Sequence, residues 1–230
     1  MTDQRFENFL SSVPQLHTWD RGKTWKSGGF NARLLRSIRT GIEASIPHDN
    51  LCIAETGAGN STILFLLMQP KRLVSIAPDE ELRDRILTYC AEKKIDSSPL
   101  EFISAFSEVA LPRFAERLRK DGQKLDVALI DGGHGWPTDF VDFCYFNLAL
   151  RKGGLLIVDD LQIYAVNEFA RWLYMQKQFS LVKDMQKTLI FRKEVEADYM
   201  GDHGAQPYIV QRKKQRGDGP GRFEFREQPK

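Results

Sequence analysis

Apolar residues follow two alternating patterns along this chain, short unbroken runs and helical repeats. The run at 51–55 is a continuous apolar stretch that ends on a glutamate, as is typical of a buried strand. In 31–46, apolar residues recur at every fourth position from Leu34 to Ile46, which predicts an amphipathic helix. The two patterns keep alternating to residue 192, so the chain is predicted to be an α/β protein.

The other elements follow in strict alternation. We expect strands at 72–77, 100–105, 126–130, 155–158, 179–184 and 188–192. We expect helices at 61–68, 80–93, 107–120, 137–150 and 163–178, with Pro137 at a first helical position and Gly153 and Gly154 as a helix break. Alternation predicts a doubly wound parallel sheet with helices on both faces. The short turn near Gln186 requires the last two strands to pair antiparallel, which gives about seven strands.

Three regions differ in composition. Residues 31–195 carry the alternating pattern and form the expected main domain. Residues 1–30 form an N-terminal extension whose aromatic residues Trp19, Trp25 and Phe30 suit a lid or core packing equally well. Residues 196–230 are rich in glycine and charge, which predicts a tail that is mobile or ordered by a partner. Its basic residues are interpreted as solvated surface in preference to a phosphate- or nucleic-acid-binding patch: Arg212, Lys213, Lys214 and Arg216.

Composition narrows the class of protein. The 230 residues are 42% hydrophobic and 28% charged, which suits one soluble domain with a full core. A net charge of +2 makes nucleic acid an unlikely partner, and no apolar run approaches a bilayer span. No basic stretch followed by an apolar one marks a signal peptide. Three widely spaced cysteines, Cys52, Cys90 and Cys144, indicate reduced core thiols in a cytoplasmic protein. Whether the protein is a monomer or a homo-oligomer stays open.

The glycines after the first strand are the first candidate for a ligand site. Gly57 and Gly59 follow the strand at alternate positions, and Asn60 and Ser61 are placed to cap the next helix. A strand, a glycine turn and a helix start bring bare backbone against a nucleotide-like ligand. The alternative is a tight turn without a ligand. Residue 62, where a dinucleotide-binding fingerprint has its third glycine or an alanine, is threonine, and no Walker sequence follows the turn.

Three acids end two later strands. Asp131 ends the strand 126–130, and Asp159 with Asp160 ends the strand 155–158. Carboxylates crowded at one sheet edge repel one another unless a cation lies among them, and oxygen ligands favour Mg²⁺, Mn²⁺ or Ca²⁺. The alternative is that the acids cap a helix or bind main chain. His134, in the loop after Asp131, suits a general base, a metal ligand, an orienting donor or simple loop packing.

Taken together, the segments ETGAGNST, DVALIDGGH and LRKGGLLIVDD resemble class I S-adenosylmethionine-dependent methyltransferases over residues 31–193. The chain is similar within that family to small bacterial metal-dependent O-methyltransferases of the catechol and macrolide-sugar types, whose fourth strand ends in Asp-Gly-Asp-His. The resemblance implies a Rossmann-like seven-stranded sheet of order 3-2-1-4-5-7-6 with an antiparallel last strand. It also implies S-adenosylmethionine as cofactor and a divalent metal, with Mg²⁺ favoured.

The resemblance also assigns roles to residues. The metal ligands would be Asp131, Asp159 and Asp160, and the catalytic residues His134 and Asp131. The cofactor would be bound by Glu55, Gly57, Gly59, Asn60, Ser61 and, as a substitute, Asp79. The family ends its second strand with an acid that holds the ribose, whereas this chain has Ala77, with Asp79 or Glu80 nearby. Gly133 replaces the second acid of the Asp-Gly-Asp-His motif.

The function expected is methylation of a small hydroxylated acceptor at oxygen, assisted by a divalent metal. Three alternatives stay open at this point. One is a methyltransferase that uses Asp131 and His134 without metal. The second is a nicotinamide-dependent oxidoreductase, which Thr62 and Ala77 disfavour. The third is a non-catalytic binding module, which Ala77 favours and the retained acids disfavour.

Overall fold

The computed structural model describes most of the chain. The described residues are 3–18, 20, 22–46, 49–196, 202, 204 and 206. The chain divides into two compact units, residues 1–199 and 200–230. The predicted tail lies almost wholly outside the described residues, and so do its basic run and Trp19. The fold described below is that of the first unit.

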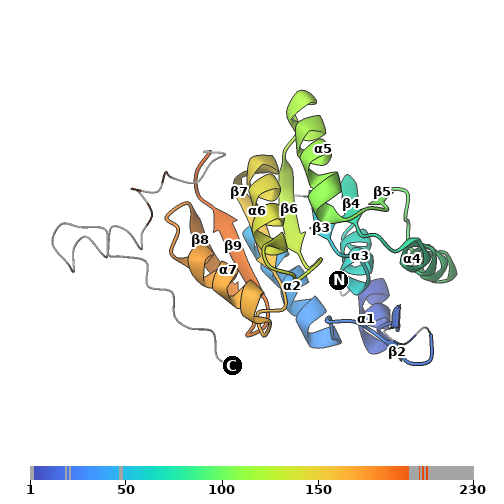
Figure 1. Cartoon of the computed structure of the whole chain (residues 1–230). Helices are drawn as coiled ribbons and strands as arrows, with labels where there is room; N and C mark the ends of the chain where they lie inside the picture. Colours follow the sequence, from blue (N-terminus) through green and yellow to red (C-terminus); the bar gives the residue numbers. More distant parts are fainter. Residues whose placement is uncertain are drawn as a thin grey trace, which may run out of the picture. The chain divides into compact units, whose positions relative to one another are not determined.

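The described part of the chain forms a seven-stranded sheet in the order β5-β4-β3-β6-β7-β9-β8 (Figure 1). Neighbouring strands are parallel except where β9 pairs with β7 and β8. This confirms the order 3-2-1-4-5-7-6 with an antiparallel last strand. The strands are β3 Cys52–Thr56, β4 Arg72–Ile76, β5 Leu100–Ile103, β6 Leu125–Ile130, β7 Leu150–Val158, β8 Phe179–Asp184 and β9 Leu189–Lys193.

Helices form two rows. Contacts link α1, α2, α3 and α4 in one row and α5, α6 and α7 in the other. The chain moves outward in opposite directions from β3 and from β6, and right-handed crossovers then place the rows on opposite faces (Figure 1). The helices are α1 Gln4–Ser11, α2 Ala32–Ser45, α3 Asn60–Leu67, α4 Glu80–Glu92, α5 Ser107–Lys120, α6 Thr138–Ala149 and α7 Tyr164–Tyr174.

The centre of the sheet is buried on both sides. Every residue of β6 is buried, as expected for a parallel strand covered by helices on each face. Every residue of α3 is also buried, because α1, α2, α4 and β4 surround it. This explains the continuous apolar run in α3, which begins directly after the glycine turn. The turn is therefore anchored between two rigid elements.

The predicted break at Gly153 and Gly154 is wrong. Both glycines lie inside β7, which starts at Leu150 and not at 155. A register shift between β6 and β7 occurs here, and a Cβ on Gly154 would lie 3.0 Å from the carbonyl oxygen of Asp126. The close approach of the two backbones at this irregularity requires glycine within the strand.

Other differences are smaller. Helix α7 ends at Tyr174, four residues before the predicted end, and Pro137 takes the N-cap position of α6. All three cysteines are free as expected, but Cys144 is exposed, so the prediction of core thiols holds fully only for Cys90. Among the described residues, none lies in a helix long and apolar enough to cross a membrane.

The N-terminal segment contains elements too short for periodicity to reveal. They are helix α1 and a small hairpin of β1 His17–Thr18 and β2 Trp25–Lys26. Helix α1 contributes apolar side chains to the same core as α2. Phe30 also belongs to this core, whereas Trp25 is exposed. The aromatic residues proposed for a lid therefore differ in their environment.

Candidate functional site

Three loops meet at the carboxyl ends of the central strands. Thr56 of β3 is paired with Ile130 of β6, which is paired with Val158 of β7. The loops that begin at Gly57, Asp131 and Asp159 therefore start side by side. Backbone hydrogen bonds fix this placement, since the Asp131 N–H donates to Thr56 O at 3.1 Å and the Asp159 N–H to Ile130 O at 3.1 Å.

Glycine is required in the turn after β3. Gly57 has φ +83°, and a Cβ there would lie 2.2 Å from the Asp131 carbonyl oxygen. Gly59 has φ +149°, and a Cβ there would lie 2.6 Å from Nε2 of His17. Side chains at these positions would be strained and would collide with neighbours. The turn thus keeps its backbone bare at the edge of the sheet where ligands of doubly wound proteins bind.

Glu55 lies near the end of β3, directly before the glycine turn, and has no exposed surface. Its Oε1 accepts hydrogen bonds from Thr62 Oγ1 at 2.5 Å and Ser75 Oγ at 2.6 Å, while Oε2 has no hydrogen-bond partner among the described residues. Burial raises the pKa of Glu55 to about 7. Contact between Glu55 and a cofactor stays a prediction.

The start of α3 differs from the expected cap. Gly59, rather than Asn60 or Ser61, is the N-cap residue, and Thr62 Oγ1 accepts the Gly59 N–H at 3.0 Å. The Asn60 amide instead donates to the carbonyl oxygens of Pro14 at 3.1 Å and Ser27 at 2.6 Å. Asn60 thereby ties the N-terminal segment to the glycine turn, and Ser61 is buried beside it.

Asp131, His134 and Asp160 form a compact cluster next to this turn. Each offers a ligand atom, and these atoms all lie within 4.8 Å of one another. Nε2 of His134 is 3.1 Å from Oδ2 of Asp160, and its Nδ1 is 3.9 Å from Oδ1 of Asp139. The sequence-predicted residues from two loops are thus brought to one point, together with Asp139 from the start of α6.

Asp159 is held differently from its neighbour. Its carboxylate is fully buried, with Oδ1 accepting a hydrogen bond from Thr188 Oγ1 and Oδ2 lying 2.8 Å from Nζ of Lys187. Lys187 also reaches Oδ1 of Asp160 at 3.2 Å. The described structure therefore places an ammonium between the two adjacent acids, while Asp159 stays outside the cluster formed by Asp131, His134 and Asp160.

The electrostatics of the cluster follow from these contacts. Burial, with the charges of Asp159 and Asp160, raises the pKa of Asp131 well above its ordinary value. The carboxylates of Asp139 and Asp160 raise the pKa of His134 to about 10, so it is an imidazolium at neutral pH. The contact with His134 in turn lowers the pKa of Asp160. Burial acts to lower the pKa of Lys187, but Asp159 and Asp160 outweigh it and raise that pKa.

Comparison with known families decides what kind of domain carries this site. Residues 54–161 match the family model of a methyltransferase domain. The match runs from β3 through the glycine turn to the acids after β7. This part of the chain is a methyltransferase domain of the class I S-adenosylmethionine-dependent type. The sheet order agrees with this class, and the two observations together favour a methyltransferase over the oxidoreductase and the non-catalytic module.

Solved structures share the fold of the methyltransferase domain at low sequence identity. The O-methyltransferase TomG from Streptomyces achromogenes, involved in tomaymycin synthesis and solved with S-adenosylmethionine, is 14% identical with TM-score 0.59, over 85% of this chain and 100% of TomG. MycE from the mycinamycin pathway, solved with Mg, S-adenosylhomocysteine and mycinamycin VI, is 11% identical with TM-score 0.53, over 74% of this chain. The match covers 51% of MycE, about half its length.

An rRNA methylase from Streptococcus thermophilus is also similar, with 15% identity and TM-score 0.51 over 69% of this chain and 95% of that protein. No curated protein matches the chain by sequence. These similarities are those of the fold, so they leave the acceptor of the methyltransferase domain to be argued from its own residues.

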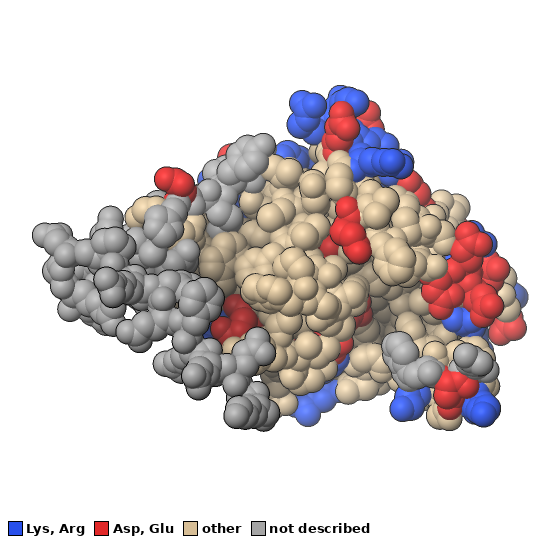
Figure 2. Space-filling view, in the orientation of Figure 1, with Lys and Arg blue, Asp and Glu red and all other residues tan. Residues whose placement is uncertain are grey.

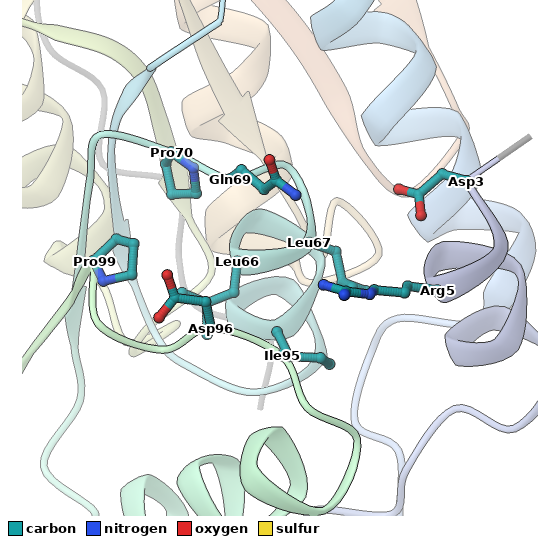
Figure 3. Close-up of a pocket in the computed structure, with 9 residues that line it drawn as sticks. All are labelled: Asp3, Arg5, Leu66, Leu67, Gln69, Pro70, Ile95, Asp96 and Pro99. Atoms are coloured by element: carbon teal, nitrogen blue, oxygen red, sulfur yellow. The ribbon is translucent and has the colours of Figure 1, made fainter. Parts of the chain in front are cut away.

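A separate cavity of about 400 Å³ lies at the amino ends of the strands of the methyltransferase sheet, opposite the acid cluster. The end of α3 and the loops before β4 and β5 line it, together with Asp3 and Arg5 (Figure 3). Arg5 reaches toward Leu67, and Gln69 and Asp96 border the hollow (Figure 3). This cavity is at the amino ends of the strands, whereas the acid cluster is at their carboxyl ends. It therefore offers positions for control variants far from the proposed chemistry.

Surface charge on the methyltransferase domain is mixed. On the face drawn in Figure 2, described Lys and Arg side chains gather at the periphery beside Asp and Glu, around a broad uncharged centre. A nucleic-acid-binding face is instead expected to carry a basic stripe or patch. The described residues on this face form no such stripe or patch (Figure 2).

Sequence reasoning missed two residues of this site. Lys187 lies in the turn between β8 and β9, far along the chain from the acids it contacts, and no motif marks it. His17 lies on a two-residue strand of the N-terminal segment and rests against Gly59. The mixed composition of residues 1–30 gave no periodic signal that would place a side chain on the glycine turn.

Proposed function

We propose that the domain transfers the methyl group of S-adenosylmethionine to an oxygen of a small hydroxylated molecule, with a divalent cation held by the acid cluster. The observation that carries this proposal is the position of Asp131, His134 and Asp160 directly beside the glycine turn. Acceptor and cofactor would then meet at one edge of the sheet. TomG, an O-methyltransferase of similar fold, supports methylation at oxygen.

The cofactor side of the site is the turn at Gly57 and Gly59. Its bare backbone and the start of α3 suit a ligand with a nucleoside part. In the reaction, the acceptor oxygen bonds to the methyl carbon while the carbon–sulfur bond breaks, and sulfur keeps the electron pair as a neutral thioether. The hydroxyl proton leaves to the Asp131 carboxylate and from there to solvent. This chemistry needs the acceptor held close and in line, so positioning by the surrounding residues is the main contribution of the protein.

The donor set fits a divalent cation. Asp131 and Asp160 offer carboxylate oxygens, and His134 adds an imidazole whose Nδ1 has no hydrogen-bond partner among the described residues. When bound, such an ion lowers the pKa of an acceptor hydroxyl and fixes its orientation. Asp159, which the sequence also proposed as a ligand, would support the site through Thr188 and Lys187.

His134 has a defined part in this proposal. Its raised pKa supports a donor of hydrogen bonds over a general base while no cation is bound. We assign His134 to orient the acceptor, and its imidazole would bind the cation only after losing its extra proton. We assign Asp131 to accept a hydrogen bond from the acceptor hydroxyl.

A second candidate is methyl transfer without a metal. The ammonium of Lys187, in contact with both Asp159 and Asp160, supplies positive charge that the acid pair would otherwise obtain from an ion. Asp131 and His134 would then hold the acceptor directly.

The test combines binding and turnover. S-adenosylhomocysteine is titrated into the protein by calorimetry, and methyl transfer to a panel of phenols and sugars is followed with Mg²⁺ or with chelator. The proposal expects saturable binding and turnover that chelator removes. Turnover unaffected by chelator would select the second candidate, and an absence of binding would contradict both.

A further inference from the structure

The end of β4 lacks the usual ribose ligand. In doubly wound nucleotide-binding sheets, an acid about 20 residues beyond the glycine turn hydrogen-bonds the ribose hydroxyls. Counting from Gly57, this position is Ala77, directly after β4. Ala77 is buried, and its methyl side chain offers no hydrogen bond. A nucleoside at the glycine turn needs another polar group at this point.

Asp79, the nearest acid, is already engaged. Its Oδ1 accepts the Leu82 N–H at 2.9 Å and so caps α4, and its Oδ2 pairs with Arg85 at 3.2 Å. A ribose would have to compete with both contacts. Asp79 is therefore poorly placed to replace the missing acid by itself.

His17 lies against the turn itself. Its ring fits between two glycines, since a Cβ on Gly59 would lie 2.6 Å from its Nε2 and a Cβ on Gly28 would lie 2.8 Å from its Cδ2. The ring also lies within the electrostatic reach of Asp79, the N-cap residue of α4, and of Arg85 in that helix, which follows β4. Burial and then Arg85 lower the pKa of His17, which keeps the imidazole neutral. A neutral imidazole has one donor and one acceptor nitrogen.

Several contacts hold the segment that carries His17. Asn60 of the turn binds the carbonyl oxygens of Pro14 and Ser27, on either side of the hairpin. Nε of Arg85 donates to Leu16 O at 2.9 Å, and its guanidinium lies 5.3 Å from the centre of the Trp25 ring. The histidine is thus preorganised on the cofactor turn from both the α3 and α4 sides.

We propose that His17 is a cofactor-binding residue that hydrogen-bonds the ribose hydroxyls of S-adenosylmethionine in place of an acid at position 77. The proposal rests on the proposed function, because it requires that cofactor at the glycine turn. It makes the N-terminal segment part of the cofactor site rather than only a cover for the acceptor.

The test compares two ligands on matched variants by calorimetry. The ligands are S-adenosylhomocysteine and its 2′,3′-dideoxy analogue, which lacks the ribose hydroxyls. One hydrogen bond predicts that the wild-type protein prefers the first ligand by about tenfold. His17→Phe keeps a ring between the glycines but removes both nitrogens, so it should weaken S-adenosylhomocysteine binding by about tenfold and abolish the preference.

Two further variants keep the result interpretable. His17→Gln retains a donor and an acceptor and should restore part of the preference, even if the phenylalanine variant is poorly folded in thermal unfolding. Lys26→Ala changes the residue paired with His17 across the hairpin and should leave both affinities unchanged.

The outcomes separate the two proposals. An unchanged ligand preference in His17→Phe and His17→Gln would overturn the role of His17 while leaving the cofactor in place. Tighter S-adenosylhomocysteine binding by His17→Phe would also overturn it, because the imidazole nitrogens would then oppose binding instead of supporting it. If the wild-type protein binds neither ligand, the proposed function itself fails.

Discussion

Lys187 and Asp159 form an ion pair with 2.8 Å between Nζ and Oδ2, in which the carboxylate is fully buried and the lysine side chain is 28% exposed. The lysine comes from the β8–β9 turn and the acid from the end of β7. The antiparallel pairing of β7 with β9 brings them together, with Val158 opposite Leu189. The β8–β9 hairpin therefore extends the sheet and also places the ammonium group of Lys187 beside the acids of the site.

Replacing Lys187 with methionine should destabilise the protein. Asp159 would remain buried without its ammonium partner, which predicts a loss of about 2–3 kcal/mol in the free energy of unfolding. Mg²⁺ should then raise the melting temperature of Lys187→Met more than that of the wild type, because an ion can replace the lost charge. Urea and thermal unfolding measure both effects. Lys177→Met, at an exposed lysine, is the control, and equal stability of the two variants would show that the pair contributes nothing.

The two adjacent acids should differ in metal binding. Asp160→Asn should weaken Mn²⁺ binding by about tenfold or more, because it removes a charged ligand of the cluster. Asp159→Asn should mainly lower stability, since the carboxylate is occupied by Thr188 and Lys187. Electron paramagnetic resonance with S-adenosylhomocysteine present reports the affinity. A larger loss for Asp159→Asn would restore Asp159 as the principal ligand.

Gly57 and Gly122 provide a matched test of the turn. Both have positive φ, +83° and +64°, but a Cβ at Gly122 meets nothing within 4 Å, whereas one at Gly57 would lie 2.2 Å from a backbone oxygen. Alanine at Gly122 should cost about 1 kcal/mol from conformation alone. Gly57→Ala should cost at least about 3 kcal/mol, since backbone must move. Similar losses in chemical denaturation would mean that the loops are not packed as described.

Burial of Glu55 predicts a pH dependence of stability. Its folded pKa of about 7 lies above the ordinary glutamate value of 4.5, so the folded state binds more protons between these values. Stability from this group is therefore present below pH 4.5 and is lost as pH rises toward 7. Wild type should lose about 2 kcal/mol more than Glu55→Gln between pH 5 and 8. Glu92→Gln, at an exposed glutamate, should follow the wild type. Parallel curves for wild type and Glu55→Gln would show that Glu55 is ionised normally.

The sequence was sufficient for the sheet and for its central loops. Period and alternation identify elements, and the parallel order places the ends of strands at one edge, so Asp131 and Asp160 could be expected to meet. The start of strand β7 could not be predicted. A pair of glycines usually indicates a break between elements, but Gly153 and Gly154 lie inside the strand at a register irregularity where two backbones approach closely.

Residues that complete the site came from outside the recognisable segments. Lys187 and His17 reach it through tertiary packing of an edge hairpin and of the N-terminal segment. Neither contact leaves a periodic or spacing signal in the sequence. Asp159 is a further example of a contact that the sequence does not reveal. Asp159 and Asp160 are adjacent in the chain, and nothing in the sequence indicates which of them Thr188 binds.

The most direct test of the account is calorimetric titration of S-adenosylhomocysteine into the wild-type protein, Gly59→Val and Gln69→Asn. The account predicts binding of one ligand per chain, lost in Gly59→Val because a side chain enters the turn, and retained in Gln69→Asn at the cavity on the opposite edge (Figure 3). Thermal unfolding confirms that each variant is folded. Failure of the wild type to bind, or loss of binding in Gln69→Asn with retention in Gly59→Val, would contradict the account.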